Sequence, residues 1–382
     1  MIRINKQFVM KSFVCITLVA ALSFFATLGA QEVGPVGDPF SQTPPPEEPE
    51  SVIKASTIDE QLEKKAYNAG VELMQAGDFE AALEKFNEAI ELKPDYAEAY
   101  TNRASIKWQQ GDITEAIEDF NQAIAAGASA DAYFGLGQCY YKDNQHDKAM
   151  ESYSKALEED AQHAHSAYYR GGLFFEKKEY EKAIADYDRA IASDPSYAYA
   201  YNDRASAKRQ LGKYDEAVAD YEKACSLEPE AVFMHNNWGS ALRRSGKHEK
   251  ALAIYTLSIQ KAHKNHLTYN LRGLTYYEMG QYEKAIADFD TCIMLNPNYA
   301  YAYLNRGCAY YKLFEYEQAL ADGNRAVELM PKNAAAYLNR GNFKEMNRDA
   351  EGACNDWRKA AELGNEKAKR YTNMQCGTTE KQ

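Results

Sequence analysis

Apolar residues recur with a helical period along most of the chain, and residues 266–299 show the pattern most clearly. There, Gly273 and Tyr277 fall on one face of a first predicted helix, which ends at Gly280. A second predicted helix follows, with apolar positions at Tyr282, Ala285, Ile286, Phe289, Cys292 and Ile293. Pro297 then ends the pair. Two helices this short cannot bury their apolar faces alone, so the hairpin needs a copy of itself on each side.

Those copies are present at a nearly constant spacing. A small residue of the first helix recurs every 34 residues, with one interval of 33, at Gly70, Ala104, Gly137, Gly171, Ala205, Gly239, Gly273, Gly307 and Gly341. An alanine follows each of them after twelve residues, and a bulky aromatic follows most alanines after four more, with Gly323 as the exception. Small residues let two helices approach to the short end of the usual 8–10 Å range, while the aromatic ring fills the space beside them.

These columns resemble the tetratricopeptide repeat family over residues 63–367. The resemblance implies an all-α fold, an α-solenoid in which about nine helix hairpins form a right-handed superhelix, followed by a C-terminal capping helix at 366–376. The repeats are expected near 63–96, 97–129, 130–163, 164–197, 198–231, 232–265, 266–299, 300–333 and 334–367. Where most repeats have glycine at the hairpin turn, four have Asn144, Lys178, Phe314 or Arg348.

The N-terminus carries a different pattern. Three basic residues precede an uncharged apolar run at residues 13–28, and Gly29 and Ala30 follow it. This order is typical of a secretory signal peptide, over residues 1–30. An uncleaved membrane anchor is the alternative, because the run is close to the roughly 17 residues that cross a bilayer. We expect export to a bacterial periplasm or cell envelope, with secretion or inner-membrane anchoring as alternatives.

Residues 31–56 contain six prolines and several glutamates without an apolar period, which predicts a semi-rigid linker. Thr57 and Glu60 match a helix capping box, so the solenoid is expected over residues 57–376, with a polar tail at 377–382. The formal net charge of −12 disfavours nucleic acid and anionic membrane surfaces as partners.

In this family the first helices line a concave groove where partners bind, so the resemblance implies a non-enzymatic scaffold for protein–protein interactions. Asparagines near the small residue of the first helix resemble the ladder with which such grooves hold extended peptides: Asn68, Asn102, Asn202, Asn236, Asn237, Asn305 and Asn339. The alternative is that these asparagines only support the hairpins.

Aromatic residues near the asparagines are expected to be at least partly exposed in the groove, namely Trp108, Phe134, Tyr141, Tyr168, Tyr199, Phe233, Tyr277, Tyr301 and Tyr311. Arg209 and Arg243 would make its centre basic, which favours an acidic partner segment. Three alternatives stay open: the aromatics pack between neighbouring helices, the tyrosines stack on sugar rings of a cell-wall glycan, or the chain assembles with itself.

Cysteine is the remaining candidate for chemistry. Cys354 and Cys376 lie about equally far along the chain from the turn near Gly364, on helices expected to be antiparallel, so they are a disulfide candidate. Two reduced thiols are the alternative. The sequence shows no catalytic triad, metal-ligand spacing or cofactor fingerprint, so we expect neither an enzyme nor a cofactor or metal site.

Overall fold

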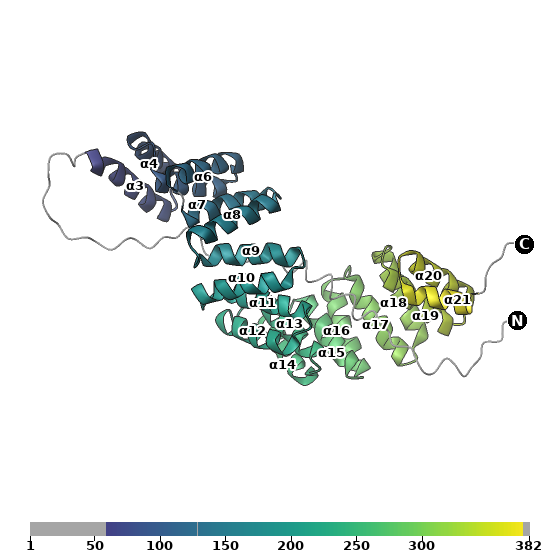
Figure 1. Ribbon diagram of the computed structural model, residues 1–382. Coiled ribbons are helices and arrows are strands. Elements are labelled where there is room, and N and C mark those ends of the chain that lie inside the picture. Colours follow the sequence, from purple (N-terminus) through teal and green to yellow (C-terminus); the bar gives the residue numbers. More distant parts are fainter. Residues whose placement is uncertain (1–58, 128, 377–382) are drawn as a thin grey trace, which may run out of the picture. The chain divides into compact units, whose positions relative to one another are not determined.

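The computed structural model describes residues 59–127 and 129–376. Every regular element in this part of the chain is an α-helix, arranged as paired hairpins (Figure 1). The all-α solenoid expected from the repeat pattern is therefore confirmed. The proposed signal peptide, linker, Thr57 cap and polar tail lie outside the described residues. The helices divide into two units, residues 59–213 and 214–376.

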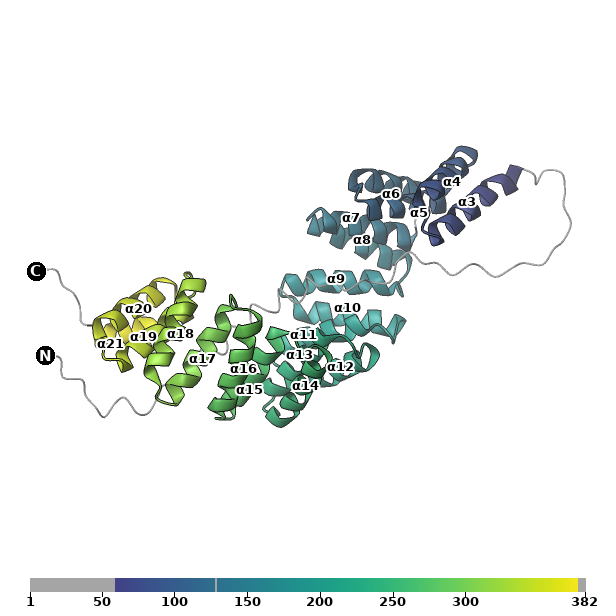
Figure 2. The ribbon, with the colours of Figure 1, turned by 180° about the vertical axis from the view of Figure 1, so that it is seen from behind.

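The unit of residues 59–213 contains α3 (Asp59–Gln75), α4 (Phe79–Leu92), α5 (Ala97–Gln110), α6 (Ile113–Gly127), α7 (Ala130–Lys142), α8 (His146–Glu159), α9 (Ala164–Glu176), α10 (Tyr180–Ser193) and α11 (Ala198–Gln210). Helices α3 to α10 form four hairpins, and each packs against the next (Figure 2).

The unit of residues 214–376 contains α12 (Tyr214–Leu227), α13 (Val232–Arg244), α14 (His248–Lys261), α15 (His266–Glu278), α16 (Tyr282–Leu295), α17 (Ala300–Lys312), α18 (Tyr316–Leu329), α19 (Ala334–Met346), α20 (Ala350–Glu362) and α21 (Glu366–Gln375). Helices α13 to α20 form four hairpins, and α21 packs on α20 where the capping helix was expected.

The small and aromatic columns meet inside each hairpin. A Cβ atom on Gly273 of α15 would lie 2.8 Å from Cε1 of Phe289 on α16, closer than real carbon atoms approach. Phe289 and Ala285 are both fully buried. The glycine is therefore required because the ring of the second helix occupies the space of its missing side chain.

The hairpin turns share one backbone conformation whether or not they carry glycine. Gly280 has φ +74°, and Asn144, Lys178, Phe314 and Arg348 have φ between +58° and +65°. The four turn residues that are not glycine therefore adopt the same left-handed conformation, although it costs a non-glycine residue about 1–2 kcal/mol.

A second set of contacts joins neighbouring hairpins. Arg306 on α17 donates from Nε and Nη2 to Asp322 on α18, at 2.8 and 2.7 Å, and from Nη1 to Asp290 on α16 at 2.5 Å. The same paired geometry, between an arginine and an aspartate sixteen residues later, recurs at Arg103–Asp119, Arg170–Asp186, Arg272–Asp288 and Arg340–Asp356. Each guanidinium therefore ties its own hairpin together and also reaches the preceding one.

Candidate functional site

Within residues 214–376, consecutive first helices approach one another closely, α13 to α15, α15 to α17 and α17 to α19, and consecutive second helices approach less closely. The first helices therefore form the inner layer of this unit. Four residues after the small position, each inner helix presents one side chain, and the four are spaced 34 residues apart: Arg243, Tyr277, Tyr311 and Glu345. We call these four residues the inner row.

The inner row concentrates buried polar atoms that have no hydrogen-bond partner. Within the described residues 214–376, such atoms occur on Trp238, Arg243, Tyr277 and Glu345, and three of these four residues belong to the row. In the other unit, Arg209 has the same repeat position and an unpartnered Nε. A buried polar group without a partner costs about 1–3 kcal/mol, so such groups are rare in folded proteins. Their recurrence at one repeat position calls for a functional explanation.

Arg243 lies on α13 with its side chain 1% exposed. Its Nη1 donates to Glu278 of α15, whose other carboxylate oxygen lies 3.4 Å from Nε2 of His248. Nε and Nη2 of Arg243 form no hydrogen bond of ordinary geometry, although the Tyr255 hydroxyl lies close to the guanidinium. Arg243 does not contribute to the basic centre that was expected here, because Glu278 neutralises its charge. Arg243 keeps two N–H groups that can donate.

The two tyrosines of the row pack on the first residue of the following helix. Tyr277 lies against Tyr282 with ring centroids 5.3 Å apart, and Tyr311 lies against Tyr316 at 5.7 Å. Burial raises the pKa of both phenols, so both are protonated at neutral pH. The Tyr277 hydroxyl has no partner. It can therefore donate or accept a hydrogen bond.

Glu345 on α19 ends the row. It is half-buried, and its Oε2 atom is buried without a hydrogen-bond partner. Loss of hydration raises the pKa of this carboxyl above its ordinary value. Sequence reasoning missed Glu345; the signal that could have found it was its 34-residue spacing from Tyr311.

The asparagine column was expected to offer its amides to a partner, and the structure corrects this for most of its members. Asn102 donates from Nδ2 to the Tyr67 hydroxyl, and Asn305 donates to Oδ1 of Asn270, both at 3.0 Å. Each of these bonds joins first helices of neighbouring repeats. The members that are at least 90% buried are Asn102, Asn202, Asn236, Asn305 and Asn339. Asn68 is exposed and Asn237 partly so.

The expectation of exposed aromatics was wrong for two residues. Phe134 is 1% exposed, because it packs among Tyr153, Tyr169 and His163, and Tyr277 is 8% exposed. The candidates that are partly exposed are Trp108, Tyr141, Tyr168, Tyr199, Phe233, Tyr301, Tyr311 and Arg209. Tyr168 donates its hydroxyl to Asp203 at 2.7 Å, so part of this set also supports the fold.

Cys354 on α20 and Cys376 after α21 form a disulfide, with Cα atoms 5.5 Å apart. It attaches the capping helix to the last hairpin.

Cys139, Cys225 and Cys292 are buried thiols, and burial raises the pKa of each to about 12. These thiols are therefore not poised to act as nucleophiles.

Two further features of the described residues bear on other functions. Among the described residues, no group of three or more potential metal-ligating side chains is close enough to hold an ion. In the same part of the chain, no helix combines the length and apolar character needed to cross a bilayer.

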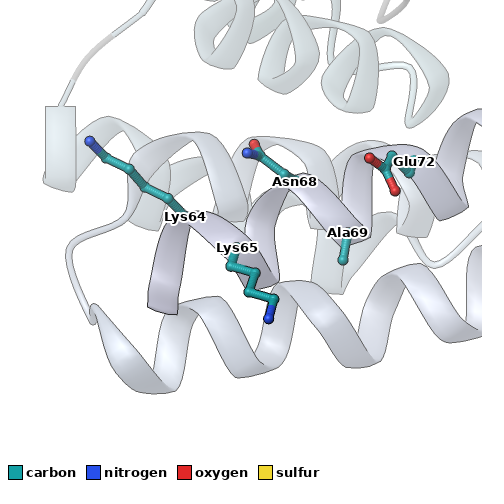
Figure 3. Close-up of a pocket in the computed structure, with 5 residues that line it drawn as sticks. All are labelled: Lys64, Lys65, Asn68, Ala69 and Glu72. Carbon is teal, nitrogen blue, oxygen red and sulfur yellow. The ribbon is translucent and has the colours of Figure 1, made fainter. Parts of the chain in front are cut away.

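A surface depression of about 460 Å³ lies on α3 and is lined by Lys64, Lys65, Asn68, Ala69 and Glu72 (Figure 3). All five residues come from one helix, on which Lys64, Asn68 and Glu72 follow one another at four-residue spacing. No second element contributes a side chain, so this surface does not have the convergent groups of a binding site.

Family models match most of the repeats. Models described as tetratricopeptide repeat match residues 67–130, 101–164, 198–230 and 300–333, and a model described as TPR repeat matches 171–208 and 273–313. Together the matched residues make up more than half of the chain.

Similar proteins are found among both sequences and solved structures. The C-terminal part of a TPR repeat-containing protein from Cytophaga hutchinsonii is 18% identical over 62% of this chain and 97% of that chain, with a TM-score of 0.50. YrrB, described as a TPR protein with an unusual peptide-binding site, is 24% identical over 49% of this chain and 96% of that chain, with a TM-score of 0.40. These likenesses concern the fold alone.

An uncharacterised protein of Methanocaldococcus jannaschii is 49% identical over 49 residues, which are 12% of this chain. The match spans 57% of that relative, so this chain covers little more than half of the relative's length.

Proposed function

The chain belongs to the tetratricopeptide repeat family, whose fold supports protein–protein interaction, and we propose that it binds an extended polypeptide segment along the inner row of residues 214–376. The observation that carries this proposal is the set of unpartnered polar atoms on Arg243, Tyr277 and Glu345. Such atoms destabilise the free protein and become paired when a partner supplies complementary groups.

An extended main chain supplies such groups at a suitable spacing. Packed helices lie about 8–10 Å apart, and an extended chain advances about 3.3 Å per residue. Successive members of the inner row would therefore meet about every third residue of the segment. Its carbonyl oxygens would accept from Arg243 and from the Tyr277 hydroxyl after a local side-chain rearrangement, because these side chains are 1% and 8% exposed in the free protein. Because Glu278 already neutralises Arg243, a neutral carbonyl suits these donors better than a second carboxylate would.

We also propose a non-catalytic role and export to the cell envelope. The buried thiols have a raised pKa, and the inner row offers hydrogen bonds rather than a nucleophile with an adjacent base. Export is supported by the order of basic, apolar and small residues at the N-terminus and by the Cys354–Cys376 disulfide, since disulfides persist in oxidising compartments. Cell fractionation followed by N-terminal sequencing tests this, and a cytosolic protein with an intact N-terminus would contradict it.

The binding proposal is tested by affinity capture from an envelope extract with three proteins: the unchanged chain, Tyr277→Phe and Tyr303→Phe. Tyr277→Phe removes a hydroxyl without a partner, so it should weaken capture of protein partners without lowering the melting temperature. Tyr303→Phe is the control, because that hydroxyl donates to the Pro297 carbonyl and its ring lies beside Arg325 of the second helix α18. Equal capture by both variants, or retention of the chain on cell-wall polysaccharide alone, would contradict the proposal.

A further inference from the structure

Glu345 differs from the other charged member of the inner row in having no opposite charge paired with its buried oxygen. Arg243 is neutralised by Glu278, whereas Oε2 of Glu345 is buried without any hydrogen-bond partner. A buried carboxylate with an unpaired oxygen is costly, and a positively charged donor is the group that compensates it best. The carboxylate therefore points to a cationic ligand.

Two tyrosines lie on helices before and after the hairpin that carries this carboxylate. Tyr311 is the preceding member of the inner row on α17, and Tyr371 lies on α21, the helix that follows the last hairpin. Tyr311 contacts Phe343, two residues before Glu345 on α19, with ring centroids 5.6 Å apart. The negative charge of Glu345 also adds to the effect of burial in raising the pKa of both phenols. Both tyrosines are partly exposed, so the site is open to solvent.

Tyr371 already accepts a cation on its ring. Nζ of Lys367 lies 5.8 Å from the ring centroid, while Trp357 packs against the same ring at 5.5 Å. The face of a tyrosine ring attracts ammonium and guanidinium groups through its quadrupole. A cation bound at Glu345 would therefore have aromatic rings nearby as well as the carboxylate.

Two exposed apolar side chains lie close to the tyrosines along the chain. Phe314 is 76% exposed and contacts Tyr316, which packs on Tyr311. Met374 is 73% exposed and lies three residues after Tyr371, on the same face of α21. Phe314 also has a backbone φ of +64°, a conformation that disfavours bulky residues. Each of the two tyrosines therefore has an exposed apolar side chain close by in the sequence.

We propose that Glu345, Tyr311 and Tyr371 form a recognition site for a lysine or arginine side chain of the bound segment, with Phe314 and Met374 contacting apolar residues beside it. This inference rests on the proposed binding of an extended segment. It specifies that the segment carries a cationic side chain at the end that binds near α19. The partner is a polypeptide that carries a cationic residue within an apolar stretch.

The test uses the full chain and a displayed library of random peptides about twelve residues long, enough to span four inner helices when extended. Peptides selected on the unchanged protein should be enriched in lysine or arginine at one position. Selection on Glu345→Gln should lose that enrichment, and selection on Tyr303→Phe should keep it. A resynthesised peptide should bind Glu345→Gln about tenfold or more weakly, as loss of a charge-assisted hydrogen bond implies.

Stability provides a readout that separates binding from a structural role. Because burial raises the pKa of the Glu345 carboxyl, its charge destabilises the folded chain at neutral pH. Glu345→Gln should therefore leave the free energy of unfolding unchanged or higher while it weakens peptide binding. A lower free energy of unfolding would overturn the proposal, since Glu345 would then stabilise the fold.

The outcomes also separate the two proposals. Peptides that depend on Tyr277 but show no cationic preference would overturn the Glu345 site and leave the binding function intact. If no peptide is selected, or if selected peptides bind equally well to Tyr277→Phe and Glu345→Gln, both proposals fail.

Discussion

Arg272 donates from Nε and Nη2 to the two carboxylate oxygens of Asp288, at 2.8 and 2.7 Å. Its Nη1 also donates to the Thr256 hydroxyl at 3.3 Å, so one guanidinium joins α14, α15 and α16. The hydrogen bonds to Asp288 raise the pKa of the Arg272 guanidinium. The planar, two-pronged ion pair therefore joins the two helices of one hairpin, and the third hydrogen bond joins that hairpin to the preceding one.

Arg272→Lys should destabilise the chain although it keeps the charge. Lysine cannot make both parallel hydrogen bonds, and Asp288 is largely buried. We expect the free energy of unfolding to fall by about 1–3 kcal/mol, measured by chemical denaturation. The control is Arg325→Lys at the exposed Arg325–Glu328 pair, which should change little. Equal effects of the two substitutions would mean that the paired geometry has no special role.

Gly171→Ala and Gly172→Ala should have opposite effects although the two residues are adjacent on α9. A Cβ atom at Gly171 would lie 2.9 Å from Cε1 of Tyr187, whereas one at Gly172 would meet nothing within 4 Å. We expect Gly171→Ala to lower the free energy of unfolding by about 1–3 kcal/mol through overpacking. Gly172→Ala should raise it by up to about 1 kcal/mol through helix propensity. If both substitutions changed the free energy of unfolding in the same direction, the close contact with the Tyr187 ring would not determine stability.

The repeat pattern was sufficient to predict the hairpins, because the 34-residue spacing fixes where small and aromatic residues meet. The arginine–aspartate pairs were missed, although their signal was present: an arginine directly before the small residue and an aspartate sixteen positions later, as in Arg306 and Asp322. Their role becomes evident only when the two helices of a hairpin lie side by side.

The site was less predictable than the fold, because repeat position indicates which layer a residue belongs to but not what its polar atoms contact. Asn305 was expected to face a partner, yet its side-chain amide donates a hydrogen bond to Asn270 of the preceding inner helix. Arg243 was expected to make the groove centre basic, yet Glu278, 35 residues later, pairs with it. Both contacts join adjacent repeats, and a repeat considered alone does not reveal them.

Loss of the Cys354–Cys376 disulfide should loosen the capping helix. The bond closes a loop between residues 22 positions apart, for which chain entropy predicts about 3 kcal/mol of stabilisation. Adding a reductant should therefore speed hydrogen exchange of the α21 amides more than that of α15. In Cys354→Ser the reductant should have no further effect on α21. Unchanged exchange in both proteins would contradict a stabilising role.

Acidification should weaken the junction around His165. Burial and the nearby His163 lower the pKa of the His165 imidazole, so the folded chain holds it neutral while the unfolded chain protonates near pH 6.5. Its contribution to stability is therefore complete above about pH 6.5 and is lost as the pH falls towards the lowered pKa. Hydrogen exchange of α9 should accelerate from pH 7 to 5.5 after correction for intrinsic rates.

His165→Phe should remove much of this acceleration, because phenylalanine can keep the ring contacts with Phe134 and Tyr197 without titrating. His263→Gln at an exposed histidine should retain it. If hydrogen exchange of α9 accelerates in His165→Phe as much as in the unchanged chain, another group causes the pH dependence.

The binding role of the inner row is tested most directly by photo-crosslinking in the native host, with p-benzoylphenylalanine placed at position 311 or at position 303. Both positions lie on α17 and are partly exposed, but Tyr311 belongs to the inner row and Tyr303 packs beside the second helix α18. We expect position 311 to crosslink to one continuous segment of a partner protein, identified by mass spectrometry, and position 303 not to do so. Equal crosslinking at both positions, or none at position 311, would contradict the account.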